Sequence, residues 1–201
     1  MSVDLGGRRV GRPRLEAADQ AIADATIECL VAEGYTGMSV DRVAERAGVG
    51  RATIYRRWSS KAELVIDAVG SRTFDALTPV DTGNLRDDLE QTLTQIQSMM
   101  QREYELIQTL NLVKARHPEV GEAFRCQLDG RLEAMTALFQ RGVDRGELPA
   151  DADVDLLARS GPALLWHRFT VSGEVPPADY AARIVALLLG QGSSSRRASS
   201  R

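Results

Sequence analysis

Residues 39–64 read SVDRVAERAGVGRATIYRRWSSKAEL, and this stretch decides the fold. Ser39 can cap a short helix, and Gly48 can end it because glycine tolerates the left-handed backbone of a tight exit. Four apolar residues between them fall on one face of that helix: Val40, Val43, Ala44 and Ala47. A second short helix is expected from Arg51 to Trp58, with arginine, threonine and tyrosine on its exposed face. Two short helices joined by a glycine-containing turn predict a helix-turn-helix, and such a face suits the DNA major groove.

The charge of the chain is uneven along its 201 residues. The net charge is −3, yet residues 1–61 hold 10 basic and 8 acidic side chains, and residues 62–190 hold 12 and 20. The last stretch, residues 191–201, holds three arginines and no acid. Because phosphate repels an acidic surface, DNA is expected to bind only at the N-terminal end.

The composition indicates a globular protein, with 43% hydrophobic and 26% charged residues. No apolar run approaches the ~18 residues of a membrane span, and the N-terminus lacks an apolar signal core. We therefore expect a cytoplasmic protein without a membrane partner. The two cysteines, Cys29 and Cys126, lie in helical apolar patterns and are interpreted as buried free thiols.

Helical periodicity continues through the chain without a strand pattern, so the expected fold is all-α with about nine helices. The expected parts are, in order, a flexible basic arm over residues 1–14, a helix-turn-helix domain over 15–61, a helical body over 62–190 and a disordered tail over 191–201. Within the arm, Arg12 and Arg14 are placed to reach the neighbouring minor groove.

Several short motifs in the N-terminal part match a known family in kind and spacing. They are Gly34-Tyr35, Ser39-Val40, Val43-Ala44, Ala47-Gly48-Val49, Thr53-Ile54-Tyr55, Trp58 and Lys61-Ala62-Glu63-Leu64. Without any insertion, this segment resembles the DNA-binding domain of the bacterial TetR-family transcriptional regulators. The Tyr-Arg-Arg-Trp run over residues 55–58 resembles one branch of that family.

The resemblance implies a homodimeric DNA-binding transcriptional regulator. Its most common form is a repressor that a small-molecule effector releases from a pseudo-palindromic double-stranded DNA operator. Residues 62–190 would then form the ligand-binding and dimerisation domain. Gly50 departs from the family pattern, because many members have serine or threonine there, which caps the recognition helix and touches phosphate.

The recognition helix and its neighbours supply the candidate DNA contacts. Arg51 and Ala52 open that helix, where arginine can read guanine and alanine can meet a thymine methyl group. A phosphate-only role for Arg51 is the alternative. The other candidates are Thr53, Tyr55 and Arg56 on the same helix, with Ser39 and Lys61 at the starts of the neighbouring helices. Of the two adjacent arginines, Arg56 is favoured for phosphate, which leaves Arg57 to pair with an acid, and Trp58 is interpreted as core.

The body offers candidate pocket and interface residues. Pocket candidates are large or polarisable, although each taken alone is more often simple core: Met99, Met100, Phe124, Trp166, His167 and Phe169. Pro162 must kink or divide the helix that precedes His167. The last helix is apolar on more than one side, which predicts a dimer interface at Ile184, Leu187 and Leu188. His117 precedes a proline and is interpreted as a loop residue.

Two other classes of protein are alternatives to a regulator. An enzyme is disfavoured because the chain has two histidines, no cysteine pair at metal-ligand spacing and no phosphate-binding glycine loop, so no catalytic residue, cofactor or metal is expected. The basic arm would suit an architectural DNA-binding protein, but such a protein would have no use for the acidic helical body. A filled core without a cavity would favour that second class.

Overall fold

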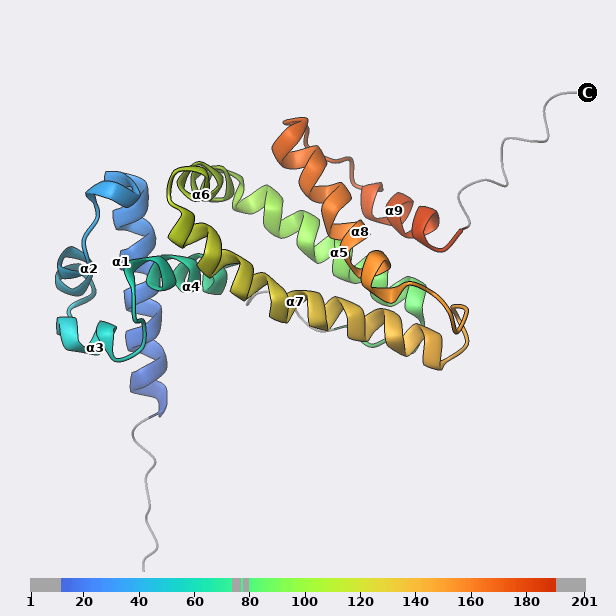
Figure 1. The fold of residues 1–201 in the computed structure, drawn as a ribbon, viewed down its shortest axis with the longest axis horizontal. Coiled ribbons are helices and arrows are strands. Elements are labelled where there is room, and N and C mark those ends of the chain that lie inside the picture. The colour runs from blue at the N-terminus through green and yellow to red at the C-terminus, as the bar shows by residue number, and fades with distance from the viewer. Residues whose placement is uncertain (1–11, 74–76, 78–79, 191–201) are drawn as a thin grey trace, which may run out of the picture.

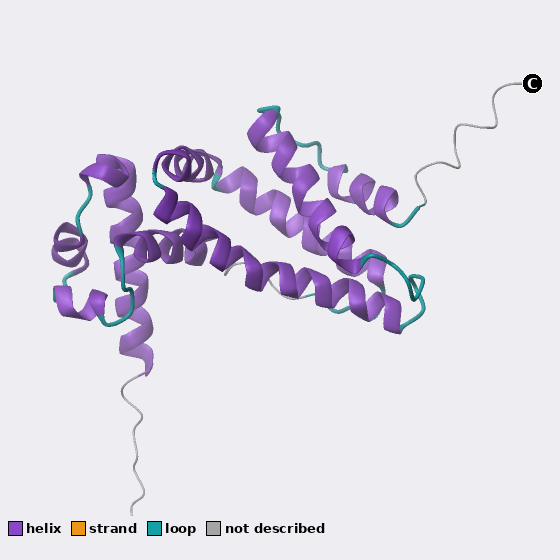
Figure 2. Cartoon of the chain, viewed as in Figure 1, coloured by secondary structure: helices purple, strands orange, loops and turns teal. Residues whose placement is uncertain are grey.

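The computed structural model describes residues 12–73, 77 and 80–190, with side chains from residue 17 onward. Every regular element in these parts is a helix (Figures 1 and 2), which confirms the all-α prediction. There are nine α-helices and one π-helical turn: α1 (Arg12–Gly37), α2 (Val40–Ala47), α3 (Arg51–Tyr55), α4 (Lys61–Thr73), α5 (Leu85–Arg102), α6 (Tyr104–Arg116), α7 (Pro118–Asp144), α8 (Val154–Trp166), η1 (His167–Val171) and α9 (Tyr180–Leu188).

Helices α1 to α3 form one end of the molecule, which we call the head (Figure 1). Gly34 interrupts α1 with φ 68°, and Gly48 ends α2 with φ 67° while its N–H donates to the carbonyls of Ala44 and Glu45. Both positions use the left-handed backbone that glycine adopts without strain. The core of the head joins all three helices through side chains no more than 1% exposed: Ile22, Leu30, Val43 and Ile54.

Helix α4 connects the head to the rest of the chain, which we call the body. It packs against α1 on one side and against α7 on the other (Figure 1). Gly70 lies where α4 meets α7, and a β-carbon at this position would run into the side chain of Gln127. Helices α4 and α7 therefore approach each other closely at this position.

The body surrounds a second apolar core, to which α5, α7, α8, η1 and α9 contribute. Large side chains no more than 2% exposed in this core include Leu89, Leu93, Phe139, Leu165 and Phe169. Helix α8 continues through Pro162 to Trp166 and is followed by the π-helical turn η1. Pro162 therefore does not divide the helix.

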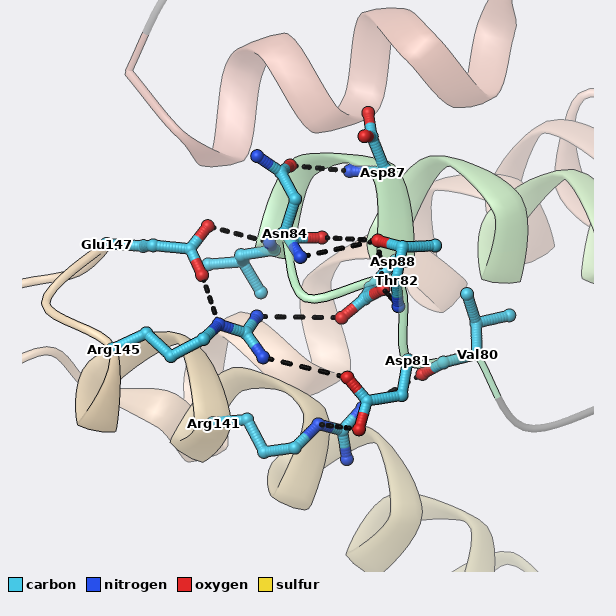
Figure 3. A network of polar contacts seen from close by, with 10 residues as sticks. Val80, Asp81, Thr82, Asn84, Asp87, Asp88, Arg141, Arg145 and Glu147 are labelled. Atoms are coloured by element: carbon cyan, nitrogen blue, oxygen red, sulfur yellow. Dashed lines mark hydrogen bonds and ion pairs between the residues drawn. The ribbon is translucent and has the colours of Figure 1, made fainter.

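A polar network fastens the loop before α5 to the far end of α7 (Figure 3). Asp88 is fully buried and accepts hydrogen bonds from the N–H and hydroxyl of Thr82, at 2.6 and 2.7 Å. Arg145 pairs with Asp81, Asp88 and Glu147, and Glu147 also accepts from the Leu85 N–H at 2.7 Å. The start of α5 is thus held by charge pairs as well as by apolar packing.

The boundaries differ from the expected ones in several places. Helix α1 begins at Arg12, so three residues assigned to the arm are helical, and the recognition helix ends at Tyr55 rather than Trp58. The prediction of two buried thiols is half wrong, because Cys29 is buried but Cys126 is exposed on α7. The remainder of the arm, residues 1–11, and the tail, residues 191–201, lie outside the described residues.

Among the described residues, no helix is long and apolar enough to cross a membrane.

Candidate nucleic-acid interface and ligand-binding residues

Helix α3 presents the residues predicted to read DNA. Ile54 is 1% exposed and fixes the helix to the core of the head. On the outer side Arg51, Ala52, Tyr55 and Arg56 are exposed, and Thr53 is half-buried. The structure thus places four of the predicted residues on α3, whose inner side is anchored by Ile54, and the fifth, Arg56, directly after its last residue.

Arg51 is already held in one orientation. Its guanidinium lies 3.0 Å from a carboxylate oxygen of Asp41 on α2 and donates to the Tyr55 hydroxyl at 3.4 Å. The hydrogen bond with Tyr55 and the charge of Asp41 raise the pKa of Arg51. Its carbon Cζ also lies 5.1 Å from the centre of the Tyr55 ring. Arg51 and Tyr55 therefore form one unit at the surface of the head.

The starts of α2 and α3 are capped differently. The Ser39 hydroxyl accepts from the Arg42 N–H at 3.3 Å, as an N-cap serine is expected to do. Gly50 precedes α3 and makes no side-chain cap. The N-terminus of α2 also carries Asp41 in its first turn.

Lys61, a predicted phosphate contact, is half-buried against the end of α1. Its Nζ donates to the carbonyls of Tyr35 at 2.8 Å and Met38 at 3.2 Å, and it lies 4.4 Å from the centre of the Tyr35 ring. An ammonium group has three N–H donors, so one remains for a phosphate. Burial, with Glu119 nearby, raises the pKa of Tyr35 to about 12.

The two residues after α3 tie it to other helices. Arg57 forms an ion pair with Asp19 of α1, the acid partner expected of one of the two adjacent arginines. Trp58 packs against the core of the head, and its ring N–H donates to Asp67 of α4 at 2.9 Å. Arg12 and Arg14 lie in the first turn of α1, and their side chains are outside the described residues.

Comparison with known proteins agrees with this arrangement. Residues 22–68 match the family model described as bacterial regulatory proteins, tetR family, and residues 79–188 match that of the tetracyclin repressor-like C-terminal domain. The chain belongs to the TetR family. It is therefore a helix-turn-helix, DNA-binding transcriptional regulator, and the family is not one of enzymes.

Individual TetR-family proteins resemble it over most of their length. The DNA-binding transcriptional repressor TetR of Mycobacteroides abscessus is 35% identical over 178 residues, which cover 86% of this chain and 92% of the relative. The TetR-family regulator SCO0332 is similar in structure, with a TM-score of 0.72, 24% identity and coverage of 88% and 98%. FadR of Bacillus subtilis, solved in complex with stearoyl-CoA, has a TM-score of 0.60 at 19% identity, with coverage of 85% and 97%.

The structure divides the predicted pocket residues among different places. Met99, Met100 and Phe169 are buried in the second core, and Trp166 packs against it. Phe124 instead packs against the core that extends from the head, and His167 is exposed. The set does not form a single cluster.

Sequence reasoning missed Lys114, which lies between the two predicted aromatic residues. Its Nζ is 3.7 Å from the centre of the Phe124 ring and 5.3 Å from that of Trp166. Burial lowers the pKa of Lys114. Local spacing could not reveal this contact, because the three residues come from three different helices.

His117 was also underestimated. It lies at the junction of α6 and α7, with its ring centre 4.6 Å from that of Tyr35 in the head. Its Nε2 is 3.4 Å from the hydroxyl of Thr36, and its Nδ1 is 3.5 Å from a carboxylate oxygen of Glu119. His117 is thus a direct contact between body and head.

The predicted interface residues differ in their exposure. Leu187 is 64% exposed on α9, whereas Ile184 is 3% exposed and faces the core of its own chain. Leu188 is half-buried against that core. Leu156 on the adjacent α8 is 60% exposed.

Proposed function

We propose that this TetR-family regulator is a homodimeric repressor that leaves a pseudo-palindromic operator when a small-molecule effector binds the body. The observation that carries the proposal is α3, anchored by buried Ile54 and presenting Arg51, Tyr55 and Arg56. The relative named as a repressor supports the direction of control, and the neighbour solved with stearoyl-CoA supports control by a small molecule. The run over residues 55–58 assigns the chain to the Tyr-Arg-Arg-Trp branch. We place the protein in the cytoplasm, with the DNA it regulates.

The roles at the DNA follow from position on the head. Arg51 and Ala52 contact base edges, because the first residues of a recognition helix lie deepest in the major groove. The remaining contacts go mainly to phosphates: Thr53, Tyr55, Arg56, the start of α2 at Ser39 and the third N–H of Lys61. Arg12 and Arg14 reach the adjacent minor groove.

The proposed dimer forms through α8 and α9. Both helices lie in the body on the side away from the head (Figure 1), and each carries an exposed leucine. A two-fold axis there would set the two copies of α3 about one DNA turn apart, ~34–36 Å. The two-fold symmetry accounts for a pseudo-palindromic operator.

Release follows from the contacts between body and head. His117 joins the α6–α7 junction to Tyr35, and Lys61 at the start of α4 also lies against the Tyr35 ring. An effector that favours another position of α6 and α7 would change the spacing of the two heads. A tenfold loss of operator affinity requires only about 1.4 kcal/mol of difference in effector binding between the two states.

An architectural DNA-binding protein is the second candidate. One observation favours it: two hollows in the described part of the chain are open grooves rather than enclosed cavities. The larger, of about 820 Å³, lies between α1, α4 and α7, and the smaller lies along α5.

Selection of duplexes from a random DNA library by the purified chain distinguishes the two candidates. A pseudo-palindromic motif is expected, and duplexes carrying it should bind the dimer. Binding without sequence enrichment, fading steadily as salt rises, would overturn the operator proposal in favour of the architectural protein.

A further inference from the structure

Lys114 is a charged side chain in the interior of the body without an acidic partner. It is half-buried on α6, and no carboxylate of the described residues lies within ion-pair distance of its Nζ. Other cations of the body are paired: Arg145 with Glu147, Arg159 with Asp155 and Arg168 with Glu174.

Burial of an ammonium group without a counter-charge is unfavourable. Desolvation is the cause that lowers the pKa of Lys114. The faces of Phe124 and Trp166 offset part of this cost, since an aromatic ring attracts a cation. The ring contacts leave the ammonium without an anion to receive its N–H donors.

The position of Lys114 is also unusual, because it lies between the two apolar cores. Phe124 packs against the core shared with the head, and Trp166 packs against the core of the body. One helical turn further along α6 is His117, the residue that touches the head. A molecule bound at Lys114 would therefore contact both cores beside the junction of α6 and α7.

We propose that Lys114 binds the acid group of an apolar organic carboxylate, with Phe124 and Trp166 lining the path of its hydrocarbon part. This proposal rests on the proposed function, for which it names the class of effector. The large groove between α1, α4 and α7 is unsuited to such a ligand, because its lining includes five acidic side chains: Asp19, Glu63, Asp67, Glu119 and Glu122.

Direct binding to the full chain, without DNA, tests the site. The probes are octanoate, decanoate, phenylacetate and indole-3-acetate, each paired with its primary amide, which has the same hydrocarbon part but no charge. In calorimetric titrations at least one acid should bind wild type tenfold or more tightly than its amide. Lys114→Met should bind that acid and its amide alike, whereas Lys114→Arg should keep a preference for the acid.

Wild type itself provides a second readout, because the chain contains only two lysines, Lys61 and Lys114. With ¹³C at the lysine ε-carbon, the acid should move the Lys114 signal and leave the Lys61 signal in place, and the amide should move neither. This measurement decides the question even if Lys114→Met fails to fold.

The proposal is overturned if no acid binds wild type more tightly than its amide, if Lys114→Met keeps the preference, or if the Lys114 signal does not respond. Operator release measured afterwards separates the two proposals. Acid that binds through Lys114 without releasing DNA upholds the site and contradicts the effector mechanism. Acid that releases DNA equally from Lys114→Met upholds the mechanism and contradicts the site.

Discussion

Arg51 is the residue on which base recognition by the head depends most directly. Its guanidinium is held between Asp41 and the Tyr55 hydroxyl, in contacts that are all solvent-exposed. An exposed ion pair contributes little to stability, so the edge of a guanine can replace Asp41 as its partner. The Tyr55 contact restricts the side chain before DNA arrives, which lowers the entropy lost on binding.

Replacement of Arg51 by alanine should relax base preference at one position in each half-site. The expected loss for the best operator is roughly ten- to a hundredfold, because a bidentate arginine–guanine contact is removed. Repeating the library selection with the variant measures both quantities. Arg125→Ala is the matched control, since Arg125 is an exposed arginine on α7 that is paired with Glu122. An unchanged preference at every position would remove Arg51 from base reading.

The sequence was informative about α3 because its signals are local. The spacing of Ile54 and the exposed Arg51 and Tyr55 follow from helix geometry alone. Lys61 shows where such reasoning stops: its Nζ binds the carbonyl of Tyr35, 26 residues away, and no local pattern encodes that contact. The exposure of Cys126 was missed for the same reason, since an apolar neighbourhood in sequence does not fix which side of α7 is covered.

At the scale of elements, the glycines of α7 differ in what surrounds them. A β-carbon at Gly142 would lie 2.6 Å from a methyl carbon of Leu85, a residue only 1% exposed. At Gly130, which is exposed in the same helix, a β-carbon would meet nothing within 4 Å. The close approach of α5 and α7 therefore requires glycine at one position and not at the other.

Gly142→Ala should destabilise the protein, while Gly130→Ala should stabilise it. Alanine stabilises a helix by about 1 kcal/mol relative to glycine, and the free energy of unfolding of Gly130→Ala should rise by nearly this amount. At Gly142 overpacking against Leu85 costs ~1–3 kcal/mol and should outweigh that gain. Urea unfolding at equal protein concentration gives both free energies. Equal stabilisation by the two changes would contradict the packing of α5 on α7.

The network at the start of α5 should make stability depend on acid. Burial alone would raise the pKa of Glu147. Hydrogen bonds from Arg145 and the Leu85 N–H lower it by more than burial raises it, so the pKa lies below its ordinary value. Because the pKa is lower in the folded state, ionised Glu147 stabilises the fold. This stabilisation is present above the ordinary glutamate pKa, about 4.3, and is lost as pH falls through the pKa of the folded state. The Glu147→Gln variant lacks this titration.

The free energy of unfolding of wild type should therefore exceed that of Glu147→Gln at pH 6, and the difference should shrink below about pH 4. Urea titrations from pH 7 to pH 3 measure it. A difference that stays constant over this range would show that the charge of Glu147 does not support the network.

Element boundaries were less predictable than the elements themselves. Nine helices follow from apolar periodicity, but α1 starts at Arg12 and α3 stops at Tyr55. Pro162 illustrates the physical reason, since a proline that would break an isolated helix lies inside α8, which packs against α7 and α9. Tertiary packing decides such cases, and it is absent from a local pattern.

At the scale of the whole molecule, the contacts that join head and body come from residues distant in sequence. His117 meets Tyr35, and Gly70 meets Gln127, across intervals that no periodicity links. The sequence could therefore predict a DNA-binding end and a helical body, but not how one acts on the other. Lys114 belongs to the same class, because its two rings come from α7 and α8.

The dimer is the property of the whole molecule that can be tested most simply. Leu187 and Leu112 are each 64% exposed, the first on α9 and the second on α6. An aspartate at Leu187 would bury an unpaired charge in the proposed interface, which is strongly unfavourable, whereas an aspartate at Leu112 would stay in water. In sedimentation, Leu187→Asp should give monomers that bind a full operator no better than a half-site, and Leu112→Asp should remain dimeric. Intact dimers from Leu187→Asp would move the interface away from α9, and monomers from Leu112→Asp would move it to α6.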